Sequence, residues 1–167
     1  MANYGRTRRE FISAAGAAHS NSTTEAISGQ VTIPANTLVA GDRIRVKAFG
    51  TCTTTNSTDT LASVLYIEGL AGTALVSNAA TDVADDDMYA FDAWLYIDST
   101  GASGTWHCDA TGFLDTTPAT VRTVTVGGAI DTTVDTVICV GLDWSVASSA
   151  NSAYTVECAA LIFRSME

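Results

Sequence analysis

The chain has 167 residues and a formal net charge of −10, with 47% hydrophobic residues and 16% charged residues. Its apolar content and its 25 threonines argue against a disordered chain, and its scarcity of lysine, glutamate and glutamine argues against a coiled coil or a helical bundle. No apolar run reaches the roughly 18 residues that a membrane-spanning helix needs. The sequence therefore predicts an all-β domain that has no membrane partner.

Residues 1–26 show neither a helical stripe nor strand alternation, so we expect an extended N-terminal arm before a β-sandwich domain over residues 27–167. Positive charge gathers at the tip of this arm. The first nine residues carry +3 and no acid, which leaves −13 for the rest of the chain. The alternative is a solvated, frayed terminus. The arm residues that we expect to bind a partner are Arg6, Arg8, Arg9, Phe11 and Ile12.

From residue 27 onward the apolar residues recur with a period close to two, which predicts β-strands. The predicted strands span residues 30–33, 43–48, 61–68, 73–77, 88–98, 105–109, 120–126, 136–144 and 153–164. Between these strands we expect a polar loop or edge at residues 51–60, an acidic loop at residues 78–87, and turns at Gly101–Gly104 and at Gly127-Gly128.

An antiparallel β-sandwich, either a jelly roll or a related Greek-key fold, is the simplest structure for these strands. Eight or nine short strands at regular spacing are typical of a sandwich, and no predicted helix is long enough to join parallel strands. The last strand, over residues 153–164, is nearly continuous in apolar residues, which favours a central position in its sheet.

The strand over residues 88–98 has large apolar groups on both faces. One face carries Tyr89, Phe91, Ala93, Leu95 and Ile97, and the other carries Met88, Asp92, Trp94, Tyr96 and Asp98. The outward face of a sandwich is normally polar, so the second set predicts either a buried layer under a loop or a subunit interface. The interface residues would be Met88, Trp94 and Tyr96.

Catalytic residues are hard to find in this sequence. His107 and Asp109 share a strand face but Cys108 points to the other side, and no serine or cysteine partner is identifiable. Asp92 and Asp98 could act as a carboxylate pair, but they serve equally well as solvent-facing residues. We therefore expect that the protein is not an enzyme.

The cysteines and the acidic loop do not form a recognisable metal site. Cys52, Cys108, Cys139 and Cys158 contain no CxxC pair, and we expect buried thiols rather than disulfides. The run from Asp82 to Asp87 lacks the EF-hand pattern, so a solvated loop is favoured over a calcium site. We expect no cofactor and no metal.

Two segments resemble virion structural proteins of tailed bacteriophages. In VTIPANTLVAGDRIRVKAFGT (Val31 to Thr51), a Pro-Ala-Asn-Thr-Leu turn precedes Gly-Asp and a strand of alternating basic and apolar residues. In the second segment, the turn at Gly101–Gly104 is followed by DTTVDTVICVGLDWSVASSANSAYTVE (Asp131 to Glu157). The resemblance covers Val31 to about Phe163 and implies a jelly-roll-like sandwich with no catalytic residues. Head decoration, head fibre and tail appendage modules all share it.

The resemblance and the basic arm together predict a capsid decoration (cement) protein. It would lie on the capsid surface of the virion after synthesis in the host cytoplasm, bind the major capsid protein through its arm, and form a homo-oligomer, with a trimer favoured. The acidic body argues against nucleic acid as a partner. The alternative is a tail or head-fibre appendage that binds a host receptor or glycan. Deleting residues 1–12 should leave a folded domain that no longer binds expanded capsids.

Overall fold

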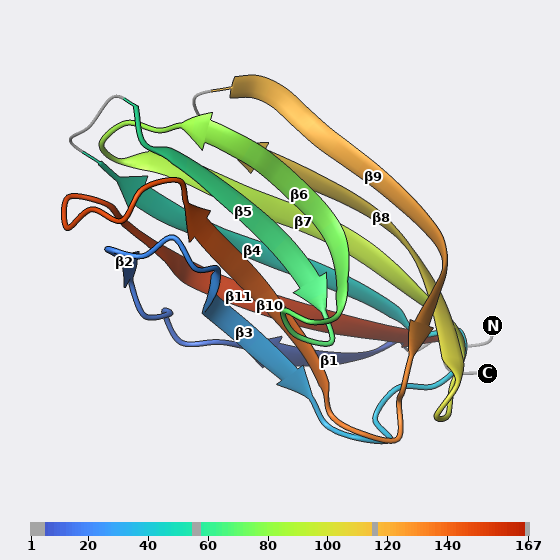
Figure 1. The fold of residues 1–167 in the computed structure, drawn as a ribbon. Helices are drawn as coiled ribbons and strands as arrows, with labels where there is room; N and C mark the ends of the chain where they lie inside the picture. The colour runs from blue at the N-terminus through green and yellow to red at the C-terminus, as the bar shows by residue number, and fades with distance from the viewer. Residues whose placement is uncertain (1–5, 55–57, 115–116, 166–167) are drawn as a thin grey trace.

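The computed structural model describes residues 6–54, 58–114 and 117–165, with side chains described from Arg9 onward apart from residues 115–121, Val126 and Ser165. These residues form eleven β-strands and contain no helix that could span a membrane. In chain order (Figure 1) the strands are β1 (Arg6–Ile12), β2 (His19–Ser20), β3 (Ala26–Ile33), β4 (Arg43–Thr53), β5 (Thr60–Ile67), β6 (Thr73–Asp82), β7 (Asp87–Ser99), β8 (Gly104–Leu114), β9 (Thr117–Ile130), β10 (Thr136–Trp144) and β11 (Ser152–Ser165).

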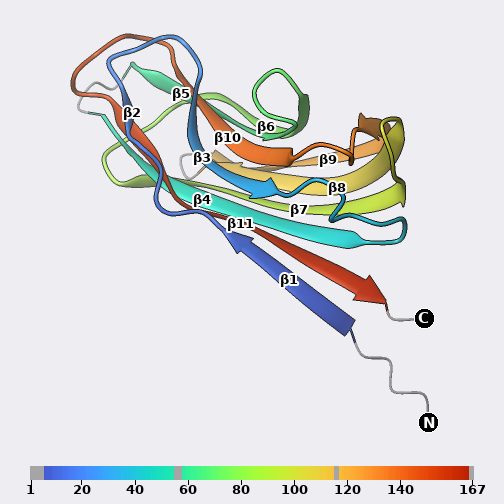
Figure 2. The same cartoon turned by 90° about the horizontal axis from the view of Figure 1, so that it is seen from below.

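The strands build two antiparallel sheets that pack face to face, which confirms the predicted sandwich (Figure 2). The large sheet has the order β1-β11-β4-β7-β8-β9, with β2 also on β11, and the small sheet has the order β3-β10-β5-β6. The pairs β1–β11, β3–β10, β4–β7 and β5–β6 nest inside one another along the chain, as in a long hairpin that has been rolled up. This is the jelly-roll topology, and β8 and β9 extend its large sheet.

The expectation that the N-terminal segment lacks regular structure is wrong for residues 6–12. They form β1, the first strand of the jelly roll, which pairs with β11 from Arg6↔Ser165 to Ile12↔Ala159. Phe11 packs against the core from this strand. This seven-residue edge strand carries four charges and little hydrophobic alternation, so its sequence does not mark it as a strand. Backbone pairing with a distant segment holds it in place. The predicted central position of the final strand, β11, is confirmed.

Two predicted loops are partly strand. The polar stretch after residue 51 continues β4 to Thr53. Thr54 is buried, and its hydroxyl is satisfied there by donating to Asn151 Oδ1 (2.8 Å). The acidic loop predicted at 78–87 is only a short turn, because β6 runs on to Asp82 and β7 begins at Asp87. Asn78 is buried there and donates to Ser63 Oγ and to the carbonyl of Phe113, both at 3.0 Å. Buried polar groups with partners of this kind cannot be read from hydropathy.

The predicted hairpin turn at Gly127-Gly128 is also wrong, since both glycines lie within β9. Gly128 is paired with Trp106 across the sheet, and a Cβ at Gly128 would meet the indole ring of that tryptophan. The glycine is therefore required by the close approach of a large buried ring. The turn predicted at Gly101–Gly104 is confirmed, with Gly101 at φ 109°.

The core contains the inward side chains of both sheets, and Trp106, Trp144 and Tyr89 are its largest fully buried members. All four cysteines are buried and free, as expected. Burial raises the pKa of Cys139 to about 11 and that of Cys158 to about 12, so both thiols remain protonated at neutral pH. They act as small apolar core residues rather than as nucleophiles.

Candidate interaction surface

The predicted interface residues lie on the side of the large sheet that points away from the small sheet, which we call the outer face. Antiparallel pairing arranges the outward side chains of β4, β7 and β8 into rungs across three strands. The rungs are Thr51–Met88, Phe49–Ala90–Phe113, Lys47–Asp92–Thr111, Arg45–Trp94–Asp109 and Arg43–Tyr96–His107. Met88 is 46% exposed, so the alternative of a buried layer under a loop does not describe this surface.

Aromatic rings and guanidinium groups stack along these rungs. The Arg45 guanidinium lies 5.4 Å from the ring centre of Trp94, and that of Arg43 lies 5.6 Å from the ring centre of Tyr96. Tyr96 stacks in turn on His107, with ring centres 4.8 Å apart and planes within 5°. Cation–π contacts and ring stacking hold large side chains flat on a surface that is open to solvent.

Most charges on β4, β7 and β8 of the outer face are paired, but two cations there lack a carboxylate of their own. Arg45 donates two hydrogen bonds to Asp92, at 3.0 and 2.6 Å, and these bonds raise the pKa of the arginine. The Lys47 ammonium is 4.0 Å from the same carboxylate, so Asp92 serves two cations. Arg43 forms no ion pair with any described carboxylate. Lys47 and Arg43 are therefore the two cations of this face that have no carboxylate of their own, while Glu157 of β11 is an outward acid beside Phe49.

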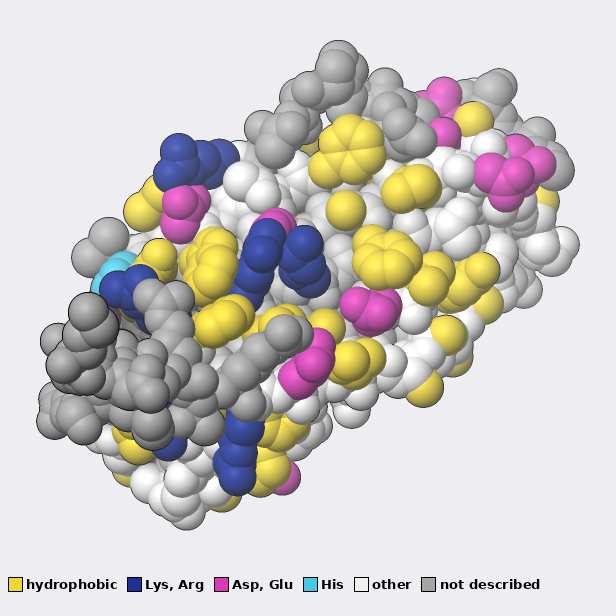
Figure 3. Space-filling view, turned by 180° about the vertical axis from the view of Figure 1, so that it is seen from behind, with side chains coloured by type: hydrophobic (Ala, Val, Ile, Leu, Met, Phe, Trp, Pro, Cys, Tyr) yellow, Lys and Arg dark blue, Asp and Glu magenta, His cyan; other side chains and the backbone are white. Residues whose placement is uncertain are grey.

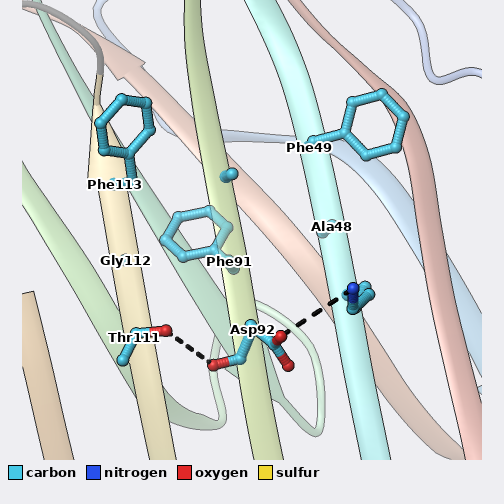
Figure 4. A pocket seen from close by; sticks show the side chains of 9 residues that line it. Ala48, Phe49, Phe91, Asp92, Thr111, Gly112 and Phe113 are labelled. Carbon is cyan, nitrogen blue, oxygen red and sulfur yellow. Dashed lines mark hydrogen bonds and ion pairs between the residues drawn. The ribbon is translucent and has the colours of Figure 1, made fainter. Parts of the chain in front are cut away.

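A hollow of about 270 Å³ opens on the outer face, where β4, β7 and β8 lie side by side (Figure 4). Phe49 on β4 and Phe113 on β8 stand on either side of Ala90 on β7, whose small side chain leaves the space between them open. The next rung closes one end with polar groups, where Lys47 contacts Asp92 and the Thr111 hydroxyl donates to the Asp92 carbonyl. The hollow thus has apolar walls and a cationic end.

Most of the exposed large hydrophobic residues that the structure describes lie on the large sheet. Six of the ten exposed large hydrophobic residues belong to strands of the large sheet: Ile12, Phe49, Met88, Val124, Tyr154 and Val156. Figure 3 looks onto this side and shows hydrophobic side chains interleaved with basic and acidic ones. Large apolar groups mixed with arginine are typical of protein–protein interfaces.

The residues considered for catalysis and metal binding have other partners. His107 Nδ1 lies 2.9 Å from Asp98, Asp109 accepts two hydrogen bonds from Arg122, and Cys108 is buried on the core side. Asp82, Asp85 and Asp86 are exposed, and the described residues contain no group of three metal-ligating side chains.

The predicted arm residues are divided between the edge of the large sheet and the core. Arg6 and Arg8 belong to β1, but their side chains lie outside the described residues. Arg9 is exposed and lines a second hollow with Arg164, whose guanidinium donates two bonds to the buried Asp42. Ile12 is 58% exposed. Phe11 packs against the core of its own chain, which corrects its assignment as a free anchor.

Sequence reasoning missed Phe49, Ala90 and Phe113. The alternation that marks residues 43–48 as a strand with a cationic face continues to Phe49, which was the available signal. Ala90 and Phe113 carry no such signal, because the hollow exists only where β4, β7 and β8 pair in this register.

Comparison with solved structures finds chains of low similarity. A structure of infectious bursal disease virus, Gx strain, matches with a TM-score of 0.39 and 14% identity over 93% of this chain and 32% of that chain. The crystal structure of the infectious bursal disease virus VP2 subviral particle matches with a TM-score of 0.35 and 15% identity over 94% and 32% of the two chains. The chain thus spans about a third of the length of these chains. No protein-family model and no curated protein sequence matches it.

Proposed function

We propose that this chain is a structural protein of a bacteriophage virion and that it decorates the outer surface of the head as a closed oligomer, with a trimer favoured. The observation that carries the proposal is the outer face of the large sheet, where Met88, Trp94 and Tyr96 lie among exposed aromatic and cationic groups. An open patch of this kind on a domain is best explained by a protein that covers it. The sequence resemblance of residues 31–51 and 131–157 to phage structural proteins supports the same role.

In this proposal the outer face forms the contact between subunits and the β1 edge binds the major capsid protein. β1 places Arg9, whose side chain is exposed, at the edge of the large sheet, where it can pair with acidic shell residues, and Arg6 and Arg8 belong to the same strand. Ile12 adds an exposed apolar contact at the end of the same strand. Because β1 is already folded, shell binding does not require the ordering of a disordered arm.

The proposal is tested by mixing the purified protein with isolated heads and, separately, with isolated tails of the parent phage. Co-sedimentation followed by gold labelling in negative stain should place the protein on heads, and Arg9→Glu should weaken this binding while leaving the sandwich folded. Arg9→Lys is the control, because it keeps the positive charge at the same exposed position of β1. Binding to neither particle, or equal binding by Arg9→Glu, would contradict the proposal.

A tail or head-fibre appendage that binds a receptor or glycan is the second candidate. The specific observation in its favour is the hollow between Phe49 and Phe113, whose aromatic walls lie beside the polar groups of Lys47, Asp92 and Thr111. Binding to tails alone in the same experiment, together with binding to a glycan array that is lost in Phe49→Ser, would establish it in place of head decoration.

A further inference from the structure

A second unusual surface feature lies away from the outer face, in the turn that joins β9 to β10. Val134 stands at this turn with 53% of its surface exposed, between Asp131 and Asp135. Three other large hydrophobic residues outside the strands of the large sheet are exposed: Ile27, Val39 and Val146. Val134 alone among these four described residues has a carboxylate within three residues on each side.

The turn around Val134 is rigidly held by hydrogen bonds. Asp131 Oδ1 accepts the backbone NH and the hydroxyl of Thr133, and Asp135 Oδ1 accepts the NH of Ala35 at 2.9 Å. The buried Thr132 is bonded to Gly101 in both directions, through its hydroxyl and through its own NH. A turn fixed in this way loses little conformational entropy when it binds a partner.

Each carboxylate of the turn has an oxygen left for an outside cation. The bonds to Asp131 and Asp135 all use Oδ1, and neither Oδ2 atom has a partner among the described residues. The hydrogen bonds from Thr133 lower the pKa of Asp131, so this acid stays charged. The turn therefore presents an apolar side chain between two negative charges.

The hollow on the outer face has the complementary features. Its apolar walls are Phe49 and Phe113, and its end is formed by Lys47, which has to share Asp92 with Arg45. Arg43, two rungs further along β4, has no described carboxylate partner. An apolar side chain flanked by carboxylates matches apolar walls beside unneutralised cations in both shape and charge.

We propose that the β9–β10 turn of one copy docks in the outer-face hollow of a second copy, with Val134 between Phe49 and Phe113 and with Asp131 and Asp135 facing Lys47 and Arg43. The turn follows Ile130, which pairs with Gly104 at the start of β8, whereas the hollow lies beside Phe113 near the end of β8. The turn therefore lies far from the hollow of its own copy and would have to enter the hollow of another. Such a head-to-tail contact gives a ring when the rotation closes.

Disulfide trapping tests this contact directly. Copies with Ala90→Cys are mixed with copies with Val134→Cys, and diamide is added as the oxidant that takes up the two protons and two electrons of the thiol pair. The mixture should form cross-links between the two variants and neither variant alone should do so. The four native thiols are buried and do not compete. Replacing Val134→Cys by Val146→Cys, at another exposed valine, is the matched control.

Each outcome of the trapping experiment decides the matter. A cross-link that needs both variants supports the head-to-tail contact. Cross-links within the Ala90→Cys sample would show that two outer faces pack on each other, and absence of any cross-link, or equal cross-linking with Val146→Cys, would show that the turn does not occupy the hollow. All three of these results overturn the proposal.

Sedimentation velocity over a concentration series provides an independent measurement. Val134→Ser and Lys47→Glu should each raise the dissociation constant for self-association by about tenfold, as expected for central interface residues. Val146→Ser, at an exposed valine elsewhere, and Lys47→Arg, which keeps the charge, should leave it unchanged. A protein that remains a single copy at every concentration, or controls that weaken association equally, would contradict the docking.

This inference rests on the proposed function only for the closed oligomer, and the two can fail separately. A protein that binds phage heads as a single copy would retain head decoration and refute the docking. A protein that cross-links head to tail but binds no phage particle would retain the docking and refute head decoration.

Discussion

The outward sides of the two sheets differ in what covers them. On the small sheet, the outward positions Cys139 and Gly141 of β10 are buried, because Glu25 and Leu70 from the chain's own connections lie over Gly141. Tyr66 on β5 donates a hydrogen bond to Glu25 and completes this cover. On the large sheet, no connection described here covers the rungs around Ala90, which border an open hollow.

The composition of the two outward sides follows the same division. Among the described residues, the strands of the small sheet carry one exposed large hydrophobic residue, Ile27, whereas those of the large sheet carry six. Large apolar side chains are thus shielded from water on the small sheet, where other segments of the chain cover them. They are exposed on the large sheet, where no described segment covers them. This contrast supports the proposal that another protein covers the large sheet.

The largest effect is expected from removing β1, which tests whether the edge of the large sheet belongs to the fold. Deleting residues 1–12 removes seven residue pairings with β11 and the contact of Phe11 with the core. We expect a loss of about 3 kcal/mol or more in the free energy of unfolding by urea denaturation. A truncated protein as stable as the full chain would show that these residues are an arm after all.

Adding the same side chain at the centre of each outward side compares the two directly. Gly141→Val should destabilise the protein by about 1 kcal/mol, because the new side chain displaces the Glu25 carboxylate from its hydrogen bond with Tyr66 and moves Leu70. Ala90→Val should change stability by no more than about 0.5 kcal/mol, because it enters the open hollow. Thermal and urea unfolding measure both. Equal costs at the two sites would remove the distinction between a covered and an open face.

The contact of Tyr66 with Glu25, which covers the small sheet, should also weaken at alkaline pH. Burial, with help from Glu25, raises the pKa of Tyr66 to about 12, above its ordinary value near 10. The stabilisation from this phenol is therefore fully present below pH 10 and is lost as the pH rises toward 12. Tyr66→Phe should be less stable than the wild type at pH 8, and the difference should shrink by pH 11 in urea unfolding. A difference that grows with pH would contradict the contact.

The smallest effect is expected from the ion pairs of the outer face. Arg45 and Asp92 are each more than a third exposed, and exposed pairs contribute at most about 1 kcal/mol. Asp92→Asn should therefore shift the free energy of unfolding by less than about 1 kcal/mol, and added salt should reduce the shift further. A loss of several kcal/mol would show that these charges hold the fold together rather than form a surface for a partner.

Strand alternation was sufficient to predict the sandwich, since a period of two is a local property of β7, β10 and β11. It also placed Met88, Trp94 and Tyr96 together on one outward face. It failed for β1, because Arg6–Ile12 is a strand only through its pairing with a segment about 150 residues away. It failed at Gly127-Gly128 for a similar reason, since Gly128 is required by the ring of Trp106 on the neighbouring strand.

The hollow and the turn could not be predicted from sequence because each depends on register or on long-range bonds. Phe49, Ala90 and Phe113 form one rung only after β4, β7 and β8 have paired. Val134 is exposed in a turn whose buried Thr132 is held by a long-range bond to Gly101. Sequence patterns therefore identified the apolar character of the outer face but not the hollow between Phe49 and Phe113.

Tryptophan fluorescence tests the central claim, that the outer face is covered in the assembled protein. Of the three tryptophans, Trp106 and Trp144 are buried in the core, so Trp94 on the outer face is the one that a quencher can reach. Acrylamide should quench Trp94 in dilute single copies and should lose that access in the assembled oligomer or on phage heads, with Trp94→Phe as the control that removes the signal. Equal quenching of Trp94 in the free and assembled states would contradict the account.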